Sequence, residues 1–230
     1  MFNPLPLSLP AQTDAELREI ICREGAQQAV PARSTILEAG EPIKGVYYIL
    51  GGRTRHFLLN AEGSEKILYV LTGGYFFGDS EYLLDASNNA YVMSEEPTEF
   101  CFIPKKKFAR LMETSERVSR AFMTNLAIKY RLLCNEVESL VFMSSKERLL
   151  QLIHSNTDPT FAFDGKWYQV KRTYTLQEIG TILGISRVTV SKLINEFCNE
   201  GVIRIVNRRM QVNIRQYNLT GAGREDGASI

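Results

Sequence analysis

The stretch that decides the fold runs from residue 177 to residue 192 and reads QEIGTILGISRVTVSK. Its apolar residues recur at helical spacing on both sides of Gly184, and glycine permits the sharp turn that would join two short helices. Thr175, followed three residues later by Glu178, has the pattern of a capping box, and Ser186 can cap the second helix. Two helices joined in this way are typical of a helix-turn-helix, whose second helix enters the major groove of DNA.

The residues that follow predict a wing. Gly201 ends the second helix, and two short apolar runs, 202–205 and 210–214, flank the basic tip Asn207-Arg208-Arg209. Polar and basic side chains on the outer face of the second helix and on the wing suit base edges and phosphates. The predicted DNA contacts are Thr175, Gln177, Ser186, Arg187, Val188, Ser191, Lys192, Arg208 and Arg209. A winged helix that docks on another protein is the alternative.

The distribution of charge favours DNA over that alternative. The 230-residue chain has 27 basic and 26 acidic residues, but residues 141–216 contain 11 basic and 6 acidic ones, a net charge of +5. Residues 1–140 contain 15 basic and 18 acidic ones. A basic module beside a mildly acidic one indicates a polyanionic partner for the basic module.

The rest of the chain predicts an α+β organisation. Short alternating runs between residues 28 and 103, separated by glycine-containing turns, are typical of an antiparallel β-roll. Residues 105–143 lack Gly and Pro and predict one long helix. Its apolar residues Phe122, Leu126, Tyr130, Leu133, Val137 and Leu140 follow a nearly heptad spacing. This spacing predicts a dimeric coiled coil, and a single helix lying on its own roll is the alternative.

The chain is therefore expected to have four parts: an effector-sensing β-roll at 1–104, a central dimerisation helix at 105–143, a winged-helix DNA-binding domain at 144–216 and a disordered tail at 217–230. No apolar run is long enough for a membrane helix, and residues 1–10 lack the basic start of a secretory signal. We therefore expect a cytoplasmic protein.

Enzymatic and metal chemistry are not expected. Cys22, Cys101, Cys134 and Cys198 lie far apart without a CxxC pair, which argues against a zinc site, an iron–sulfur cluster or a disulfide framework. A β-barrel metalloenzyme needs several histidines in its barrel, and His56 is the only one in the predicted roll. No nucleophile–base pair is visible either. We therefore expect no enzyme activity, no metal and no cofactor.

With these parts in order, residues 177–192 resemble the helix-turn-helix of the cyclic-AMP receptor/FNR family of bacterial transcription regulators. Residues 38–42, 46–52 and 74–78 fit the same family, so the resemblance spans about residues 15–216. It implies a homodimer that binds a small effector and a pseudo-palindromic double-stranded DNA site, and that contacts RNA polymerase if it is an activator.

The resemblance also gives roles to the recognition helix. It places Arg187 against a guanine or a phosphate. Val188 stands where many members have a glutamate, and because valine can contact only a thymine methyl group, we expect an A·T pair there. Lys192 stands where arginine is common, and it can bind guanine or phosphate with less geometric constraint.

The sensor departs from the best-known branches of the family. Members that bind cyclic nucleotides have Arg-Ser or Arg-Thr where this chain has Asn88-Asn89, so a cyclic phosphate would lack its cation here. The oxygen-sensing branch needs clustered cysteines near its N-terminus, where this chain has only Cys22. Haem-based sensors use a histidine of the roll, and His56 reads as an ordinary surface residue of a strand.

A closer resemblance is to the branch that senses ortho-halogenated phenols. The shared features are residues 63–69, Asn88-Asn89-x-Tyr91, Lys129 and residues 188–191. It implies an effector between roll and central helix, near Tyr69, Gly78, Asp79, Asn88, Asn89 and Lys129, with the lysine pairing a phenolate or carboxylate. Asp79 is a departure that would weaken anion binding. Another small organic effector remains an alternative. A further alternative is a regulator of the same family that needs no ligand, either constitutive or switched by thiol oxidation, with Cys198 as the candidate thiol.

Overall fold

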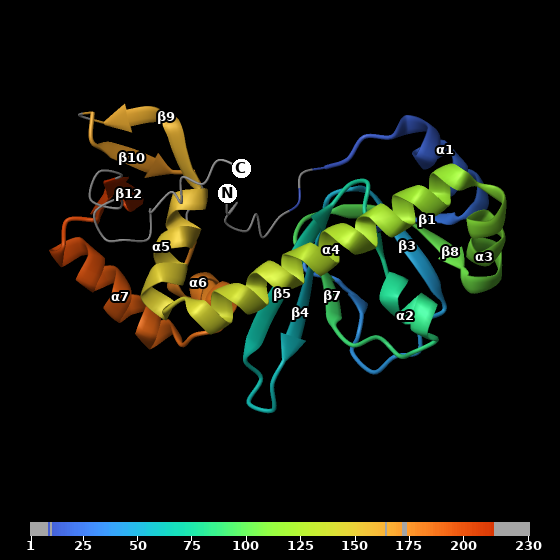
Figure 1. The fold of residues 1–230 in the computed structure, drawn as a ribbon, viewed down its shortest axis with the longest axis horizontal. Coiled ribbons are helices and arrows are strands. Elements are labelled where there is room, and N and C mark those ends of the chain that lie inside the picture. Colours follow the sequence, from blue (N-terminus) through green and yellow to red (C-terminus); the bar gives the residue numbers. More distant parts are fainter. Residues whose placement is uncertain (1–8, 10, 164, 172–173, 214–230) are drawn as a thin grey trace, which may run out of the picture. The chain divides into compact units, whose positions relative to one another are not determined.

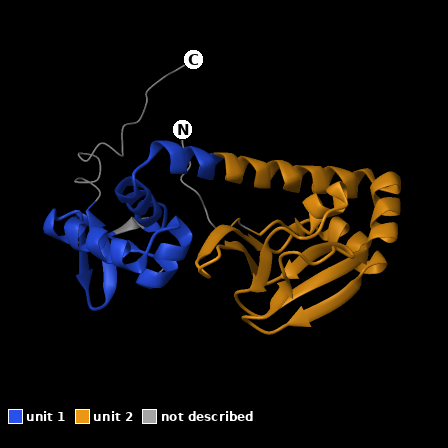
Figure 2. Ribbon diagram, turned by 90° about the horizontal axis from the view of Figure 1, so that it is seen from below, with its two compact units in different colours: residues 1–6, 135–230 blue, residues 7–134 orange. Residues whose placement is uncertain are grey.

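The computed structural model describes residues 9, 11–163, 165–171 and 174–213. The chain divides into two compact units, which we number in chain order (Figure 2). The first is residues 7–134, drawn orange and labelled unit 2 in the figure, and the second is residues 135–230 together with 1–6, drawn blue and labelled unit 1. The division falls inside helix α4 (Glu116–Phe142). The tail expected at 217–230 lies outside the described residues.

The first unit is a β-roll made of two antiparallel four-stranded sheets (Figure 1). One sheet has the order β1-β8-β3-β6, and the other has the order β2-β7-β4-β5. The strands are β1 (Ala26–Val30), β2 (Thr35–Leu37), β3 (Gly45–Gly51), β4 (Arg53–Leu59), β5 (Glu65–Thr72), β6 (Phe76–Phe77), β7 (Tyr91–Ser94) and β8 (Thr98–Pro104). A short helix that the sequence did not predict, α2 (Asp79–Leu84), follows β6. The predicted α+β roll is thus confirmed.

The core of this unit forms where helices cover the first sheet. Helix α1 (Ala15–Glu24) is capped by Asp14, whose carboxylate accepts a hydrogen bond of 2.9 Å from the backbone NH of Leu17. The cap fixes the helix so that Leu17 and Ile21 face the sheet. The core unites residues of α1, β3, β6, β8, α3 and α4: Leu17, Ile21, Val46, Tyr48, Leu50, Phe76, Cys101, Ile103, Phe108, Leu111, Val118 and Phe122.

The single helix expected at 105–143 is wrong in detail, because the structure has two helices there. Helix α3 (Lys105–Thr114) ends at Ser115, which adopts an extended backbone with φ of −126° and ψ of 104°. The hydroxyl of Ser115 then accepts a hydrogen bond of 3.4 Å from the backbone NH of Val118, in the first turn of α4. A search for Gly and Pro misses this break, because serine interrupts a helix by capping the next one.

The apolar residues of the nearly heptad row on α4 are buried at the start of the helix and exposed toward its end. Phe122 is fully buried in the roll, whereas Tyr130 is 70% exposed, Val137 58% and Leu140 48%. Val141 and Phe142 are also exposed. The end of α4 therefore presents apolar side chains that the described chain does not cover.

The second unit contains a winged helix-turn-helix. Its elements are α5 (Ser145–Ser155), β9 (Thr157–Phe163), β10 (Trp167–Val170), α6 (Leu176–Leu183), α7 (Arg187–Asn199), β11 (Ile203–Val206) and β12 (Arg209–Asn213). The strands form one antiparallel sheet in the order β11-β12-β10-β9. The winged helix-turn-helix predicted for the C-terminal part of the chain is confirmed as a fold, and the last residues of the predicted domain lie outside the described part.

Candidate DNA interface and effector site

The two helices of the helix-turn-helix are fixed by their caps. The Thr175 hydroxyl accepts from the backbone NH of Glu178 at 3.1 Å, and the Glu178 carboxylate accepts from the backbone NH of Thr175 at 2.7 Å. Gly184 ends α6 with a φ of 67°, and Ser186 caps α7 by accepting from the backbone NH of Thr189 at 3.1 Å. Both predicted caps and the glycine turn are therefore present.

Gly180 is a second glycine that the turn requires, and its role was not predicted from the sequence. A Cβ atom at this position would lie 2.7 Å from the backbone oxygen of Ile185 and 3.6 Å from the backbone nitrogen of Arg187. The missing side chain lets α6 approach the start of α7. The small residue in the middle of a predicted amphipathic helix was the signal available in the sequence.

Two basic side chains of α5 hold the helix-turn-helix in place. Arg148 donates a hydrogen bond of 2.8 Å to the backbone oxygen of Leu183, at the end of α6. Lys146 pairs with Glu196 at 2.5 Å and with Glu200 at 2.6 Å, both on α7. These contacts leave the opposite face of α7 open to a partner.

The open face of α7 carries the predicted DNA-contacting residues. Arg187, Val188 and Lys192 are exposed and Ser191 is half-buried, while Val190, Ile194 and Phe197 pack into the domain. Within the described residues, neither Arg187 nor Lys192 forms an ion pair. On α6, Gln177 is exposed beside the Thr175 cap. Because the cations are exposed and unpaired, this surface suits phosphates and base edges.

The wing ends in a tight two-residue turn. Val206 pairs with Arg209, so Asn207 and Arg208 form the loop, and both have positive φ, at 49° and 62°. Two left-handed residues in a two-residue hairpin are the pattern of a type I′ turn, in which glycine is preferred at the second position. The turn holds Arg208 and Arg209 together at the exposed tip.

In the first unit, the predicted effector residues Lys129 and Asp79 form a buried ion pair. Lys129 on α4 is 4% exposed, and Asp79 at the start of α2 is 3% exposed. The Lys129 ammonium contacts the Asp79 carboxylate and donates a hydrogen bond of 2.9 Å to the backbone oxygen of Phe76. Asp79 therefore occupies the place at Lys129 that the sequence analysis gave to an effector anion.

Asn125, one helical turn before Lys129, supports this arrangement. Its side chain is 1% exposed, and its oxygen accepts a hydrogen bond of 2.9 Å from the backbone NH of Phe76. Positions 125 and 129 share one face of α4, so both side chains bind the backbone of β6. Two polar residues four apart on a face otherwise expected to be apolar were the signal that could have identified Asn125.

His56 is buried, and its interpretation as a surface residue is wrong. It is 3% exposed, lies with its ring centroid 4.9 Å from that of Tyr69 and 5.6 Å from that of Phe77, and hydrogen-bonds Thr54 at 3.1 Å. Burial and the positive charge of Lys129 hold the pKa of His56 well below its usual value. Burial and the charges of Asp79 and Glu81 raise the pKa of Tyr69. The imidazole is thus neutral and the phenol protonated at neutral pH.

The remaining predicted effector residues have other surroundings. The Asn88 amide donates to the backbone oxygens of Glu38 and Ala90, so it holds its own loop together. Asn89 is exposed. Gly78 precedes α2 with a φ of 73°. The structure brings together Lys129 and Asp79, with Tyr69 within electrostatic reach of Asp79, and it gives Asn88 a structural contact.

The cysteines are free thiols. Burial raises the pKa of Cys198 on α7. The pKa of Cys101 is raised to about 12, first by burial and then by Cys22, which lies beside it. Raised pKa values keep both thiols protonated, which lowers their reactivity toward oxidants. Among the described residues, no group of His, Cys, Asp and Glu is arranged to hold a metal ion. No helix in the same residues is long and apolar enough to cross a membrane.

The chain matches two protein-family models, the cyclic nucleotide-binding domain at residues 27–115 and the Crp-like helix-turn-helix domain at residues 147–218. The cAMP-activated global transcriptional regulator CRP of Haemophilus influenzae is 29% identical over 175 residues, which cover 75% of this chain and 77% of that protein. The protein of the same name from Pasteurella multocida is 28% identical over 166 residues, covering 71% and 78%.

Solved structures show the same fold. The c-di-GMP responsive global regulator CLP of Xanthomonas campestris aligns with a TM-score of 0.76 at 17% identity, over 87% of this chain and 99% of that one. CprK complexed with OCPA aligns with a TM-score of 0.66 at 21% identity, over 88% and 94%. The two family matches, in the order of the roll and the winged helix described above, identify the chain as a DNA-binding transcription regulator of the CRP/FNR family.

Proposed function

We propose that the protein is a homodimeric transcription regulator whose DNA binding is controlled by a small aromatic acid or phenol that binds at Lys129, and that cyclic AMP is not its effector. The observation that carries this proposal is the buried ion pair between Lys129 and Asp79. An ammonium group in the interior must be neutralised by an anion, and Asp79 supplies that anion in the structure. An acidic effector would take over this role.

The neighbours of the pair indicate the chemical class. The His56 ring lies against the rings of both Tyr69 and Phe77, so an aromatic body would find apolar ring surface close by. The Tyr69 phenol keeps its proton because its pKa is raised, and it can therefore donate a hydrogen bond to an anionic oxygen. An effector that releases Asp79 would change the contacts between α2 and α4, which is the differential interaction that a switch requires.

A cyclic nucleotide is the second candidate, because the curated relatives are named as cAMP-activated. The residues favour it less. The Asn88 amide is engaged by backbone oxygens, and Asn89 offers no charge for a cyclic phosphate. Thiol control through Cys198 is also less favoured, because burial raises the pKa of that thiol.

The dimer is proposed from the end of α4. Tyr130, Val137 and Leu140 continue the nearly heptad row and are exposed. A second copy of α4 would cover this row, as in a two-stranded coiled coil. Two recognition helices related by a two-fold axis would then read a pseudo-palindromic site.

The experiment is thermal unfolding of the full chain with an ortho-chlorinated phenol acid, its dechlorinated form, cyclic AMP and cyclic GMP. Ligand that binds the folded state raises the unfolding midpoint. Asp79→Asn should bind the phenol acid more tightly than the natural chain, because the ligand no longer competes with a carboxylate. The double variant D79N/K129M replaces the pair by neutral groups of similar size and should fold yet lose acid binding.

A midpoint that rises with either phenol acid in the natural chain, rises further in Asp79→Asn and stays unchanged in the double variant would support the proposal. A rise with a cyclic nucleotide alone would contradict it and favour the second candidate. Equal binding of the phenol acid by the double variant would show that Lys129 does not receive the effector.

A further inference from the structure

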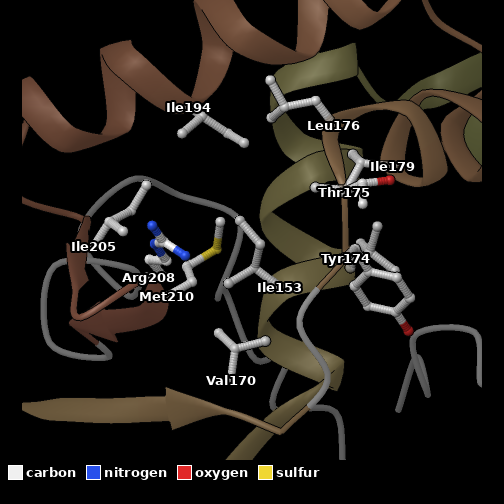
Figure 3. A pocket seen from close by; sticks show the side chains of 11 residues that line it. Ile153, Val170, Tyr174, Thr175, Leu176, Ile179, Ile194, Ile205, Arg208 and Met210 are labelled. Atoms are coloured by element: carbon white, nitrogen blue, oxygen red, sulfur yellow. The ribbon is translucent and has the colours of Figure 1, made fainter.

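We infer that the DNA-binding domain has a small-molecule site of its own, inside the second unit, which takes a small aromatic or branched aliphatic monocarboxylate. The site is a cavity of about 240 Å³ among α5, α6, α7 and the wing. In Figure 3, Ile205, Arg208 and Met210 form one wall, and Tyr174, Thr175, Leu176 and Ile179 form the opposite wall. It shares no residue with the Lys129 site.

The lining selects an apolar body. Aliphatic side chains from three helices, among them Ile153, Ile179 and Ile194, surround the cavity. The polar groups at its edge are already engaged. The Tyr174 hydroxyl donates to the Asn156 side chain at 3.1 Å, and the Thr175 hydroxyl caps α6. An apolar cavity of about 150 Å³ is enough to hold benzene, so a single substituted ring or a short branched chain fits this volume.

Arg208 selects an acid. It is the one charged residue among those that line the cavity, and within the described residues no ion pair engages its guanidinium. Its backbone has a φ of 62° at the turn position where glycine is preferred, so a side chain is kept at a position that disfavours it. A carboxylate at the wing side of the cavity would pair with this guanidinium in a charge-assisted hydrogen bond.

The site would couple ligand binding to DNA binding directly. Arg208 is exposed at the wing tip and is predicted to contact a DNA phosphate. A carboxylate that neutralises it removes one phosphate contact per subunit, which weakens binding to all sequences alike and lowers the salt slope of DNA binding by about 1 for each subunit that holds the ligand. The ligand would act as an inhibitor of DNA binding, separate from the effector at Lys129.

The test uses the full chain with D79N/K129M as background, so that an acid cannot bind at the Lys129 site. The probes are benzoate and benzyl alcohol, which share the ring and differ in charge. Binding is measured by calorimetry and by the thermal midpoint, and DNA affinity by anisotropy over a range of salt concentrations. Arg208→Gln removes the cation, and Arg209→Gln is its matched control at the same wing tip. Ile205→Trp fills the cavity while keeping Arg208.

We expect saturable benzoate binding that is at least about tenfold tighter than that of benzyl alcohol. Arg208→Gln should abolish this preference, Arg209→Gln should retain it, and Ile205→Trp should prevent both probes from binding. Absence of saturable binding of both probes would overturn the site. Equal affinity for the two probes, or an acid preference unchanged in Arg208→Gln, would overturn its assignment to acids. Benzoate binding unchanged in Ile205→Trp would place the ligand outside the cavity.

Discussion

At the scale of single residues, Arg187 is the cation best placed to read a base. It is exposed at the start of α7, one residue after the Ser186 cap. Arg187→Ala should weaken binding to the preferred DNA site by about 1–3 kcal/mol and relax the preference at one base pair. Arg209→Ala, on the wing, should weaken binding to all DNA sequences about equally. Anisotropy titrations with the preferred site and with single base-pair changes distinguish the two, and an unchanged preference in Arg187→Ala would refute this placement of α7.

His56 gives the stability of the roll a pH dependence. The unfolded chain binds a proton at this residue near pH 6.5, whereas burial and Lys129 hold the pKa of folded His56 well below that value. The contribution of neutral His56 is therefore complete above about pH 6.5 and is lost as the pH falls, by up to about 1.4 kcal/mol per pH unit. Urea unfolding at several pH values should show the slope. His56→Phe should remove the part of this pH dependence that comes from His56, while the part from His154 stays in both chains. Equal slopes of the free energy of unfolding against pH in the natural chain and in His56→Phe would contradict the assignment.

At the residue scale, the sequence predicts which side chains belong to a site better than it predicts which residues they contact. Lys129 and Asp79 were both predicted near the effector, but Asp79 was read as a repulsion, because nothing local shows that a residue 50 positions earlier lies against the lysine. Burial of His56 escaped prediction for the same reason. The caps Thr175 and Ser186 were predicted correctly, because a cap is decided within three or four residues.

At the scale of elements, Gly180 decides whether α6 can approach α7. In Gly180→Ala the new methyl group would meet the backbone oxygen of Ile185, and backbone yields less easily than a side chain. We expect a loss of about 1–3 kcal/mol in the stability of the DNA-binding domain and weaker DNA binding. Chemical denaturation measures the loss. Gly165→Ala is the matched control, since a Cβ there meets no atom within 4 Å. Its φ of 64° gives it a strain cost of its own, so a larger loss there than at Gly180 would contradict the steric account.

The exposed apolar row of α4 predicts self-association. Val137→Glu places a charge in the proposed interface of each copy, so the dimer should dissociate at concentrations about 100-fold higher than for the natural chain. Asn135→Glu, two residues away on the opposite face of the helix, should leave association unchanged. Sedimentation velocity over a dilution series checks both variants. A chain that is monomeric throughout, or equal effects of the two variants, would contradict the proposed interface.

The elements themselves followed from periodicity, with instructive exceptions. The antiparallel roll, the winged helix and the capped helices were predicted, because alternation and turn residues are local signals. The break at Ser115 and helix α2 were not, because serine caps and a six-residue helix leave little periodic trace. The row on α4 could be predicted as apolar, but the burial of Phe122 in the roll and the exposure of Tyr130 depend on tertiary packing.

At the scale of the whole molecule, one chain combines a roll with an internally neutralised lysine and a winged helix with unpaired cations. The order of these parts and the charge of each were readable from the sequence, and so was the family. The neutralisation of Lys129 inside the roll could not be read from the sequence, because it depends on which anion lies against the lysine in the folded chain. The proposed dimer would convert one recognition helix into a symmetric pair.

Selection of bound sequences from a random double-stranded DNA library tests the central claim, a homodimer that reads DNA through α7, most directly. The account predicts enrichment of a two-fold symmetric motif with half-site centres about 10 base pairs apart and an A·T pair facing Val188. A single unrepeated half-site would contradict the dimer. The selection is run without ligand and with the ortho-chlorinated phenol acid, and recovery of unenriched DNA under both conditions would contradict sequence recognition by α7.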